Sequence, residues 1–376
     1  MVDFLVAFAR RLLRPAVARR HPELASLGFF LRRGPLADAL APLDGLRFPR
    51  GLVFHIPPAN VDTIFVYSWA LSALCGNANI VRISERAAGA ATVVLDALNE
   101  TLADADPVVG RTQSMLSYGR DDAVTARLSA ACDLRVIWGG DASVAAIRQF
   151  PLAPHARDLT FPDRSSFTVI SVDGWGRATG QEKRAAAEGL YNDSYWFDQA
   201  ACASPRTVFW VGGAGAAGAP DSPAGRARRE FWQLLGEVVA AKHPDIDAAM
   251  AVEKRVATYG LALDGHATGL HYTGNTVATV DLRDPADLPR RWLGTGVFPE
   301  SEVATLADLA PLVERRDQTV THFGFTEPEL LDFARLLAGR GVDRFVPMGE
   351  ALSFAATWDG YHLPHEFTRQ VTIKTR

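Results

Sequence analysis

Segments of strand length alternate with helix-like segments up to about residue 170, and this alternation constrains the fold more than any other feature. The apolar run at 51–56 ends at Pro57-Pro58, where a ladder of backbone hydrogen bonds cannot continue. Strands joined by helices form parallel sheets covered on both faces, so the sequence predicts a doubly wound α/β layer. The predicted strands are 51–56, 79–83, 134–138 and 166–172, and the predicted helices are 61–74, 84–102 and 142–149.

The chain is long enough for more than one domain, because its 376 residues are 48% hydrophobic and can bury more than one core. The second half again mixes helices with strands. Helices are predicted over 175–191, 224–242 and 327–339, the last capped by Thr326, and strands over 207–211, 277–281, 296–298 and 368–374.

Composition excludes several classes of protein. A formal net charge of −4 gives no strong attraction to nucleic acid. The three cysteines are widely spaced without a CxxC pair, which indicates a reducing compartment, and we expect the cytoplasm. No apolar run is long enough to span a membrane, and the nine histidines show no metal-binding spacing.

The segment 1–20 is basic and amphipathic. It suits either a membrane surface or the core of its own domain, and we favour a first helix packed on its own domain. A secretory signal is not expected, because Asp3 stands where such a signal has basic residues and the apolar run is short.

Cys202 stands where a polar, aromatic segment meets the strand predicted at 207–211. Its neighbours Ala201 and Ala203 are small, so a substrate carbonyl could approach the sulfur closely. A thiolate is the strongest protein nucleophile at neutral pH, which makes Cys202 a candidate catalytic residue. The alternative is a buried cysteine that acts as a small hydrophobic side chain.

Two strand-to-helix junctions are candidate nucleotide sites. Gly139 and Gly140 precede the helix predicted at 142–149, whose first N–H groups can face an anion or a ribose, although ordinary turns share this pattern. At the other junction, Arg82 can bind phosphate and Glu85 can accept from ribose hydroxyls. The alternative there is surface charge beside a helix cap.

Other polar residues carry weaker signals. Asn60 follows a strand and can donate to a developing oxyanion or serve a turn. The segment 213–218 matches GxGxxG, but 219–223 separates it from the next helix, so we interpret it as a flexible loop. His55 is expected in the core, whereas His362 and His365 are candidates to line a site.

Taken together, these segments resemble the LuxC family of long-chain fatty acyl-CoA reductases, a branch of the aldehyde dehydrogenase superfamily. The resemblance covers most of the chain from about residue 28 and rests on four blocks: PRGLVFHIPPANVDTIFVYSWALSALCGNANIVRISE (49–85), YNDSYWFDQAACASPR (191–206), QTVTHFGF (318–325) and GVDRFVPMGEALSFAATWDGYHL (341–363). The chain is shorter at the N-terminus than typical members.

The resemblance implies a role for each matching residue. Cys202 is similar to the superfamily nucleophile, and Asn60 to the asparagine that forms the oxyanion hole with the backbone N–H of that cysteine. A superfamily motif that holds the adenosine ribose falls on Arg82, Ser84 and Glu85, and arginine in place of lysine favours NADPH. The glycine turn beneath the cofactor falls on Gly139, Gly140 and Ser143.

The resemblance also implies an aldehyde dehydrogenase-like α/β architecture with a Rossmann-type cofactor domain, an α/β catalytic domain and a C-terminal oligomerisation strand. We expect a cofactor domain over 1–173 with part of 345–366, a catalytic domain over 174–344 and the oligomerisation strand over 367–376. That strand implies a homo-oligomer.

One departure bears on the reaction. Hydrolytic aldehyde dehydrogenases have a glutamate that activates water, and this chain has Thr160 near that place. We therefore expect NADPH-dependent reduction of an acyl thioester to the aldehyde through an acyl-Cys202 intermediate. The acyl donor is an acyl-CoA, an acyl group on a companion acyl-protein synthetase, or a carrier-protein thioester. The alternatives are an oxidative aldehyde dehydrogenase and a non-catalytic scaffold subunit.

Overall fold

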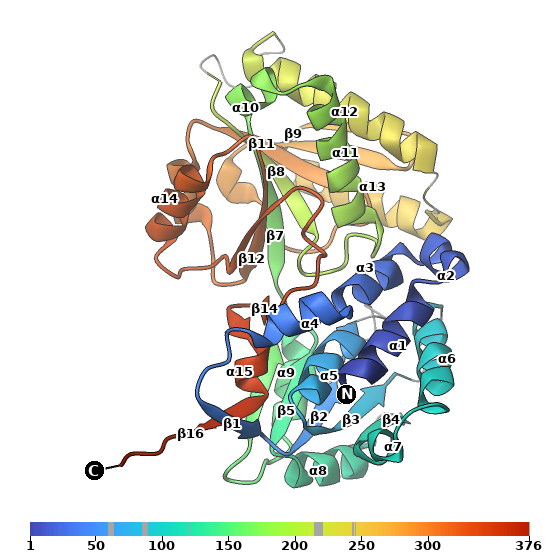
Figure 1. Cartoon of the computed structure of the whole chain (residues 1–376). Helices are drawn as coiled ribbons and strands as arrows, with labels where there is room; N and C mark the ends of the chain where they lie inside the picture. Colours follow the sequence, from blue (N-terminus) through green and yellow to red (C-terminus); the bar gives the residue numbers. More distant parts are fainter. Residues whose placement is uncertain are drawn as a thin grey trace. The chain divides into compact units, whose positions relative to one another are not determined.

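The computed structural model describes residues 1–58, 64–84, 89–119, 121–213, 221–242, 244 and 246–375 (Figure 1). The chain divides into two compact units. The first comprises Met1–Asp163 and Ser353–Arg376, and the second comprises Arg164–Leu352. No helix in the described ranges is both long and apolar enough to cross a bilayer.

The first unit contains a five-stranded parallel sheet with helices packed around it. Its elements are α1 (Val2–Leu12), α2 (Pro15–Arg20), α3 (Pro22–Phe30), α4 (Arg33–Leu40), β1 (Leu46–Pro49), β2 (Leu52–Ile56), α5 (Ile64–Leu74), β3 (Ala78–Ile83), α6 (Ala90–Leu102), α7 (Pro107–Thr112), β4 (Gln113–Ser117), α8 (Asp122–Ala131), β5 (Leu134–Trp138), α9 (Asp141–Arg148), β6 (Arg157–Phe161), β14 (Thr357–Trp358), β15 (Tyr361–His362), α15 (Leu363–Glu366) and β16 (Thr368–Val371).

The strand order β4-β3-β2-β5-β6 makes this sheet doubly wound, as the sequence predicted. The chain leaves β2 toward β3 and β4 and later returns to add β5 and β6 on the other side. Right-handed crossovers therefore place α5 and α6 on one face and α8 and α9 on the other. The order in which strands are added reverses between β2 and β5. Such folds bind ligands at this point, outside the carboxyl ends of the strands.

The N-terminal helix α1 packs on its own unit, as expected. Its apolar face is buried, and α1 lies against α3 and α6. The rings of Phe4 and Phe8 each meet the indole of Trp69 edge-on, with centroids 6.4 Å apart. The apolar side that would face a membrane is therefore covered by protein.

The final strand is shorter than the sequence predicted. β16 ends at Val371 and pairs antiparallel with β1 of the same chain. Its expected role in joining a partner subunit stays a prediction.

The second unit is a seven-stranded mixed sheet with helices on both faces. Its elements are β7 (Ser165–Ser171), α10 (Val172–Arg177), α11 (Gly180–Tyr195), β8 (Pro205–Val211), α12 (Pro223–Lys242), α13 (Ala248–Leu263), β9 (Ala267–Thr273), β10 (Val277–Leu282), η1 (Pro285–Asp287), β11 (Val297–Val303), η2 (Leu306–Leu312), β12 (Asp317–Phe323), α14 (Glu327–Leu337) and β13 (Arg344–Pro347).

The boundary between the units differs from the boundary expected at residue 173. β7 pairs with β8 and β12 in the second unit's sheet, so the second unit begins at Arg164. β13 pairs with β12 in the same sheet, so the chain returns to the first unit only at Ser353. Strand pairing, which the sequence pattern does not specify, sets both positions.

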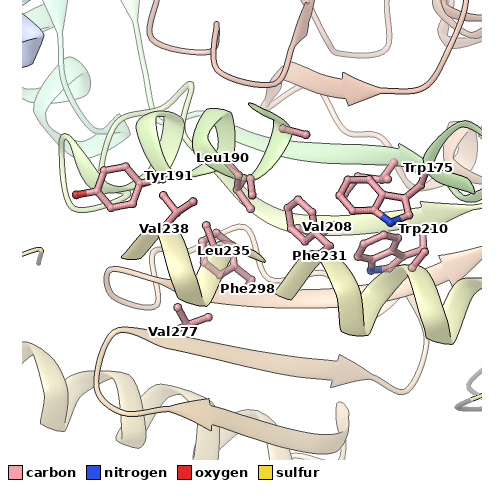
Figure 2. Close-up of a cluster of buried hydrophobic side chains, with 14 of the residues drawn as sticks. Trp175, Leu190, Tyr191, Val208, Trp210, Phe231, Leu235, Val238, Val277 and Phe298 are labelled. Carbon is pink, nitrogen blue, oxygen red and sulfur yellow. The ribbon is translucent and has the colours of Figure 1, made fainter. Parts of the chain in front are cut away.

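Alternate residues of β8 pack on the two faces of the second sheet. Val208 and Trp210 join the buried side chains of α10, α11 and α12 on one face (Figure 2). Phe209 and Val211 join those of η2 and α14 on the other. This alternation is the period-two pattern of a central strand with both faces covered.

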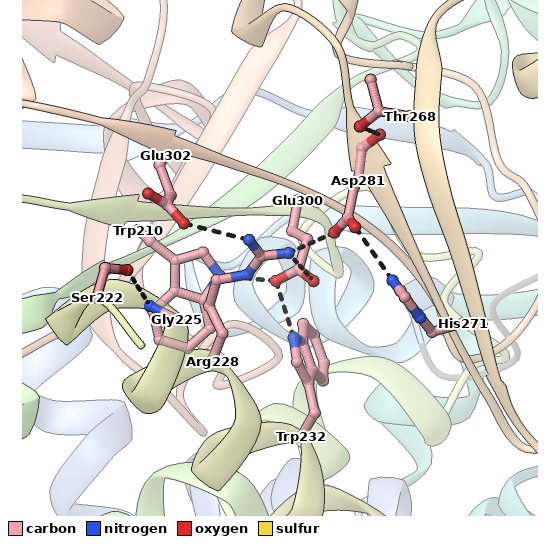
Figure 3. Close-up of polar contacts among 10 residues, drawn as sticks. All are labelled: Trp210, Ser222, Gly225, Arg228, Trp232, Thr268, His271, Asp281, Glu300 and Glu302. Atoms are coloured by element: carbon pink, nitrogen blue, oxygen red, sulfur yellow. Dashed lines mark hydrogen bonds and ion pairs between the residues drawn. The ribbon is translucent and has the colours of Figure 1, made fainter. Parts of the chain in front are cut away.

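A polar cluster is built around Arg228 of α12 (Figure 3). Its guanidinium contacts the carboxylates of Asp281, Glu300 and Glu302, at 2.9 Å for Glu300 and 3.2 Å for Glu302. Glu300 also accepts the indole N–H of Trp210 and of another tryptophan, Trp232. Burial raises the pKa of Glu300 against the pull of Arg228. The cluster therefore ties α12 to β8, β10 and β11 around the buried carboxylate of Glu300.

Candidate active site

Cys202 lies in the turn between α11 and β8, at the end of the sheet where β7, β8, β11 and β12 begin. The Ser166 hydroxyl of β7 donates a hydrogen bond to the Cys202 carbonyl oxygen over 2.7 Å. Cys202 is partly exposed, between the buried Ala201 and Ala203. The structure thus places the predicted nucleophile in a tethered turn with small neighbours.

The peptide plane before Cys202 is also fixed. The Ser204 N–H donates to the Ala201 carbonyl oxygen over 3.0 Å. In a trans peptide the N–H and the C=O point in opposite directions. The Cys202 N–H, which shares a plane with the Ala201 carbonyl, is therefore directed away from the hydrogen bond inside this turn.

The other two cysteines are poor candidates for a nucleophile. Burial raises the pKa of Cys75 to about 12 and the pKa of Cys132 to about 11. Both therefore stay protonated near neutral pH, and a thiol is a far weaker nucleophile than a thiolate. A nucleophilic role falls to Cys202 among the three cysteines.

The carboxyl ends of the parallel strands bring several predicted cofactor residues to one edge of the first unit's sheet. Arg82 lies in β3, and Gly139 directly follows β5. Ser84 directly follows β3 and is partly exposed. Asn60 and Glu85 lie outside the described residues, so their predicted roles remain predictions.

Arg82 is held at this edge by the two residues that directly follow β4. Its guanidinium carbon lies 4.8 Å from the centroid of the Tyr118 ring. One guanidinium nitrogen donates to the Gly119 carbonyl oxygen over 3.0 Å. A planar cation stacked on an aromatic ring keeps a defined orientation, which suits a site for phosphate.

The start of α9 is already occupied by a carboxylate of the chain. The Asp163 carboxylate accepts the Asp141 N–H, and the Asp141 carboxylate accepts the Asp163 N–H, each over 3.2 Å. A Cβ atom on Gly140 would lie 3.0 Å from an Asp163 oxygen. Two acidic side chains at this helix start disfavour a phosphate and favour hydroxyl donors. The predicted Gly139, Gly140 and Ser143 turn therefore fits a ribose better than an anion.

His55 is a core residue, as expected. It is fully buried, and its ring nitrogens contact the Ser68 hydroxyl at 3.1 Å and the Asn79 side chain at 2.9 Å. Burial lowers the pKa of His55 to about 4, so the ring is neutral at physiological pH.

His362 and His365 contact each other through their Nδ1 atoms, 2.7 Å apart. They lie beside β16 in the first unit. Within the described ranges, no group of three histidine, cysteine or acidic residues is arranged to hold a metal ion. Of the GxGxxG segment, only Gly213 is described.

Sequence reasoning missed three buried residues, one that contacts Cys202 and two that precede it in the chain. Ser166 lies far from Cys202 in sequence, so no local pattern connects them. Gln199 is fully buried beside the Cys202 turn. Asp193 accepts the N–H groups of Gly349 and Ala351 over 2.7 and 2.9 Å. Gln199 and Asp193 were within the block that carried the family resemblance, but their partners are visible only in the fold.

A comparison with known protein families gives a match over most of the chain. Residues 45–370 match the family model described as acyl-CoA reductase (LuxC). The chain belongs to the LuxC acyl-CoA reductase family. The resemblance seen in the sequence is thereby confirmed.

Relatives in the LuxC family include long-chain acyl-protein thioester reductases of two bacteria. The protein of Photorhabdus luminescens is 25% identical over 312 residues, which cover 80% of this chain and 59% of that protein. The protein of Aliivibrio fischeri is 26% identical over 167 residues, which cover 44% of this chain and 33% of that protein. The matched part of the chain thus spans about a third to three fifths of the length of these relatives.

The fold of this LuxC family member is aldehyde dehydrogenase-like. Lactaldehyde dehydrogenase from Escherichia coli has a TM-score of 0.65 at 12% identity, covering 98% of this chain and 84% of that chain. The predicted fold class is confirmed.

Proposed function

We propose that this protein reduces an acyl thioester to the corresponding aldehyde with NADPH, through an acyl group bound to Cys202. The observation that carries the proposal is the partly exposed Cys202 in a tethered turn, within a chain of the acyl-CoA reductase family. Membership of that family supports the reaction class, and the fold supports a nicotinamide cofactor.

In the first step the Cys202 thiolate attacks the acyl carbonyl carbon. A carbon–sulfur bond forms to Cys202, the bond to the donor's sulfur breaks, and the donor leaves as a thiolate that takes up a proton. Asn60, together with the Cys202 N–H, is proposed to stabilise the oxyanion between these events.

In the second step the acyl-Cys202 thioester is reduced by two electrons. Bound NADPH would supply the hydride for this reduction and would leave as NADP⁺, and with a proton on its oxygen the acyl group would become a hemithioacetal on Cys202. Cleavage of the bond between the acyl carbon and the Cys202 sulfur then releases the aldehyde, and the hydroxyl proton of the hemithioacetal restores the thiol.

The first unit offers side chains that fit the nucleotide. The Arg82 guanidinium is oriented by Tyr118 and suits the 2′-phosphate that distinguishes NADPH from NADH. The Asp163 carboxylate at the start of α9 suits ribose hydroxyls, as do the Ser84 hydroxyl and the Glu85 carboxylate. We propose that these residues bind the cofactor.

Release of a free acid is not expected. Thr160 of β6 has no ionisable side chain, and the family resemblance puts it near the glutamate that activates water in hydrolytic aldehyde dehydrogenases. Without a general base, attack of water on the thioester is slow. The acyl group on Cys202 therefore persists until hydride arrives.

The acyl donor is proposed to be a long-chain acyl-CoA or an acyl group carried on a protein. The family model is described as an acyl-CoA reductase, whereas the relatives are named for acyl-protein thioesters. Both donors present the same thioester carbonyl to Cys202, so the chemistry of the first step is shared.

Product analysis tests the proposal. Incubation with a long-chain acyl-CoA and NADPH should give one aldehyde per NADPH consumed, and Asn60→Ala should lower the rate about a hundredfold, the usual effect of removing an oxyanion donor. Aldehyde with NADP⁺ but without CoA should give no free acid. Accumulation of free acid would instead identify an oxidative aldehyde dehydrogenase.

A further inference from the structure

Two consecutive residues before the Cys202 turn adopt left-handed backbone conformations. Asp198 has φ of 51° and Gln199 has φ of 58°. Residues with a side chain rarely adopt this conformation, and long side chains such as glutamine adopt it less readily than aspartate. Such strain persists where surrounding contacts enforce it, and it is often found at functional sites.

The side-chain amide of Gln199 provides these contacts. Its Nε2 donates to the Pro205 carbonyl oxygen at 2.8 Å and to the Val297 carbonyl oxygen at 3.1 Å. Its Oε1 accepts the Gly296 N–H at 3.0 Å. Gln199 is 1% exposed, so water does not compete for these bonds. One amide thereby links the Cys202 turn to the first residues of β8 and β11.

The acceptor side of this link has little freedom to move. Gly296 has φ of +71°, and a Cβ atom there would lie 2.0 Å from the Thr276 carbonyl oxygen. Asp198 is fixed from the same segment, because its carbonyl oxygen accepts the Trp292 indole N–H over 2.7 Å. The strained pair is thus held by the start of β8 and by the segment that runs from Trp292 to Val297.

Ser166 holds the other side of the turn. Its hydroxyl donates to the Cys202 carbonyl oxygen and accepts the Thr319 N–H over 3.2 Å. The Cys202 turn is therefore held from two sides. Gln199 hydrogen-bonds to the starts of β8 and β11, and Ser166 of β7 hydrogen-bonds to Cys202 and to Thr319 of β12.

We propose that Gln199 is a positioning residue for the reaction at Cys202, with Ser166 as its counterpart on the opposite side of the turn. The inference rests on the proposed role of Cys202 as the acylated nucleophile. Gln199 does not touch the substrate in this account. It fixes the backbone so that the thiolate meets the acyl carbonyl, and so that the Cys202 N–H keeps its direction, at no cost in reorganisation during the reaction.

This role makes a specific kinetic prediction. Loosening the turn affects the bond-forming step and leaves the recognition of the donor unchanged. The maximal rate constant of acylation should fall, and the donor concentration at half-maximal rate should not change.

The test is single-turnover acylation, followed by intact-protein mass spectrometry over a range of acyl-CoA concentrations. In Gln199→Met, which keeps the length of the side chain but removes the amide, the maximal rate constant should fall at least tenfold. The half-saturating concentration should stay within threefold of that of the original protein. Ser166→Ala should show the same pattern with a smaller loss.

Gln113 provides a matched control. Its amide, in β4 of the first unit, accepts from the Trp69 indole and the Asn79 side chain and donates to the Asn77 carbonyl oxygen. Gln113→Met removes a comparable set of hydrogen bonds far from Cys202 in the sequence. Its acylation rate constant should stay within threefold of the original.

A further variant, Gln199→Glu, adds a pH readout. The introduced carboxyl can donate to Pro205 or Val297 only when protonated, so acylation relative to the original protein should recover as pH falls. If Gln199→Met does not fold, Ser166→Ala and Gln199→Glu decide the matter by these criteria.

The outcomes separate the two claims. If the original protein forms no adduct with acyl-CoA or with a protein-bound acyl group, the proposed function fails, and the positioning role fails with it. If the original protein is acylated and the Gln199 variants keep rate constants within threefold with no pH-dependent recovery, the function stands and the positioning role is wrong.

Discussion

The carboxylate of Asp163 accepts the backbone N–H of Asp141 at the first residue of α9. A helix start usually attracts anions, because its unpaired N–H groups carry partial positive charge. Here the chain supplies its own anion at the glycine turn where a cofactor is proposed to bind. The electrostatics of this turn therefore favour a group that donates hydrogen bonds, such as a ribose hydroxyl.

Asp163→Asn tests that assignment. If the carboxylate accepts a hydrogen bond from a ribose hydroxyl, the variant should bind NADPH about tenfold more weakly or worse, because hydrogen bonds to charged groups contribute roughly 1.5–3 kcal/mol. Titration of nucleotide fluorescence measures the dissociation constant. Tighter binding of NADPH by the variant would show instead that a phosphate lies at this helix start.

Arg82→Met should change the preference between the two nicotinamide nucleotides. Loss of the guanidinium removes the partner of the 2′-phosphate, so the dissociation constant for NADPH should rise at least tenfold and that for NADH should stay within threefold. Arg127→Ala, which alters an exposed arginine of α8, serves as the control. An equal loss of affinity for both nucleotides would show that Arg82 does not select for the 2′-phosphate.

The pH dependence of stability should carry a contribution from Asp193. Burial raises the pKa of Asp193 from 3.8 to about 7, although the N–H groups of Gly349 and Ala351 favour its charged form. Between these two pH values the folded protein binds a proton that the unfolded chain has released. The contribution of Asp193 to the free energy of unfolding therefore falls as pH rises from about 4 to about 7.

Melting temperatures of the original protein and of Asp193→Asn, compared from pH 5 to pH 8, measure this effect. The original protein should lose stability relative to the variant as pH rises, since asparagine does not titrate. Asp173→Asn, which alters an exposed aspartate at the start of α10, serves as the control. A constant difference between the original protein and Asp193→Asn at all pH values would contradict the raised pKa.

The strand-and-helix alternation of the first half was predictable from sequence because its central strands are continuous apolar runs. β2, β3 and β5 were found within a residue or two of their limits. The cap of α14 was also predicted, and Thr326 forms the reciprocal capping hydrogen bonds with Glu329. A similar signal was overlooked at Thr179 and Glu182, which separate α10 from α11 by the same kind of cap.

Elements with polar sequences were missed. β12 is a buried strand, yet it contains Asp317, Gln318 and three threonines or histidines among its seven residues. Its polar groups are paired across the sheet, as in the 2.7 Å contact between the hydroxyls of Thr168 and Thr321. A hydrophobicity pattern cannot detect a strand whose stability depends on such long-range partners.

The candidate site was predictable where chemistry and local sequence coincide. Cys202, Arg82 and the glycine turn all stood out by residue type and by place between elements. Gln199, Ser166 and Asp163 did not, because each acts through the backbone of another segment. Their contribution depends on strand order and register, which only the fold specifies.

The central claim is that Cys202 carries the acyl group, and intact-protein mass spectrometry tests it most directly. After incubation with a long-chain acyl-CoA, or with a protein-bound acyl group, the protein and a Cys75→Ala variant should each gain the mass of one acyl group. Cys202→Ala should gain none. Adding NADPH should remove the adduct as aldehyde appears. An adduct that persists in Cys202→Ala, or aldehyde formed by that variant at an undiminished rate, would contradict the account.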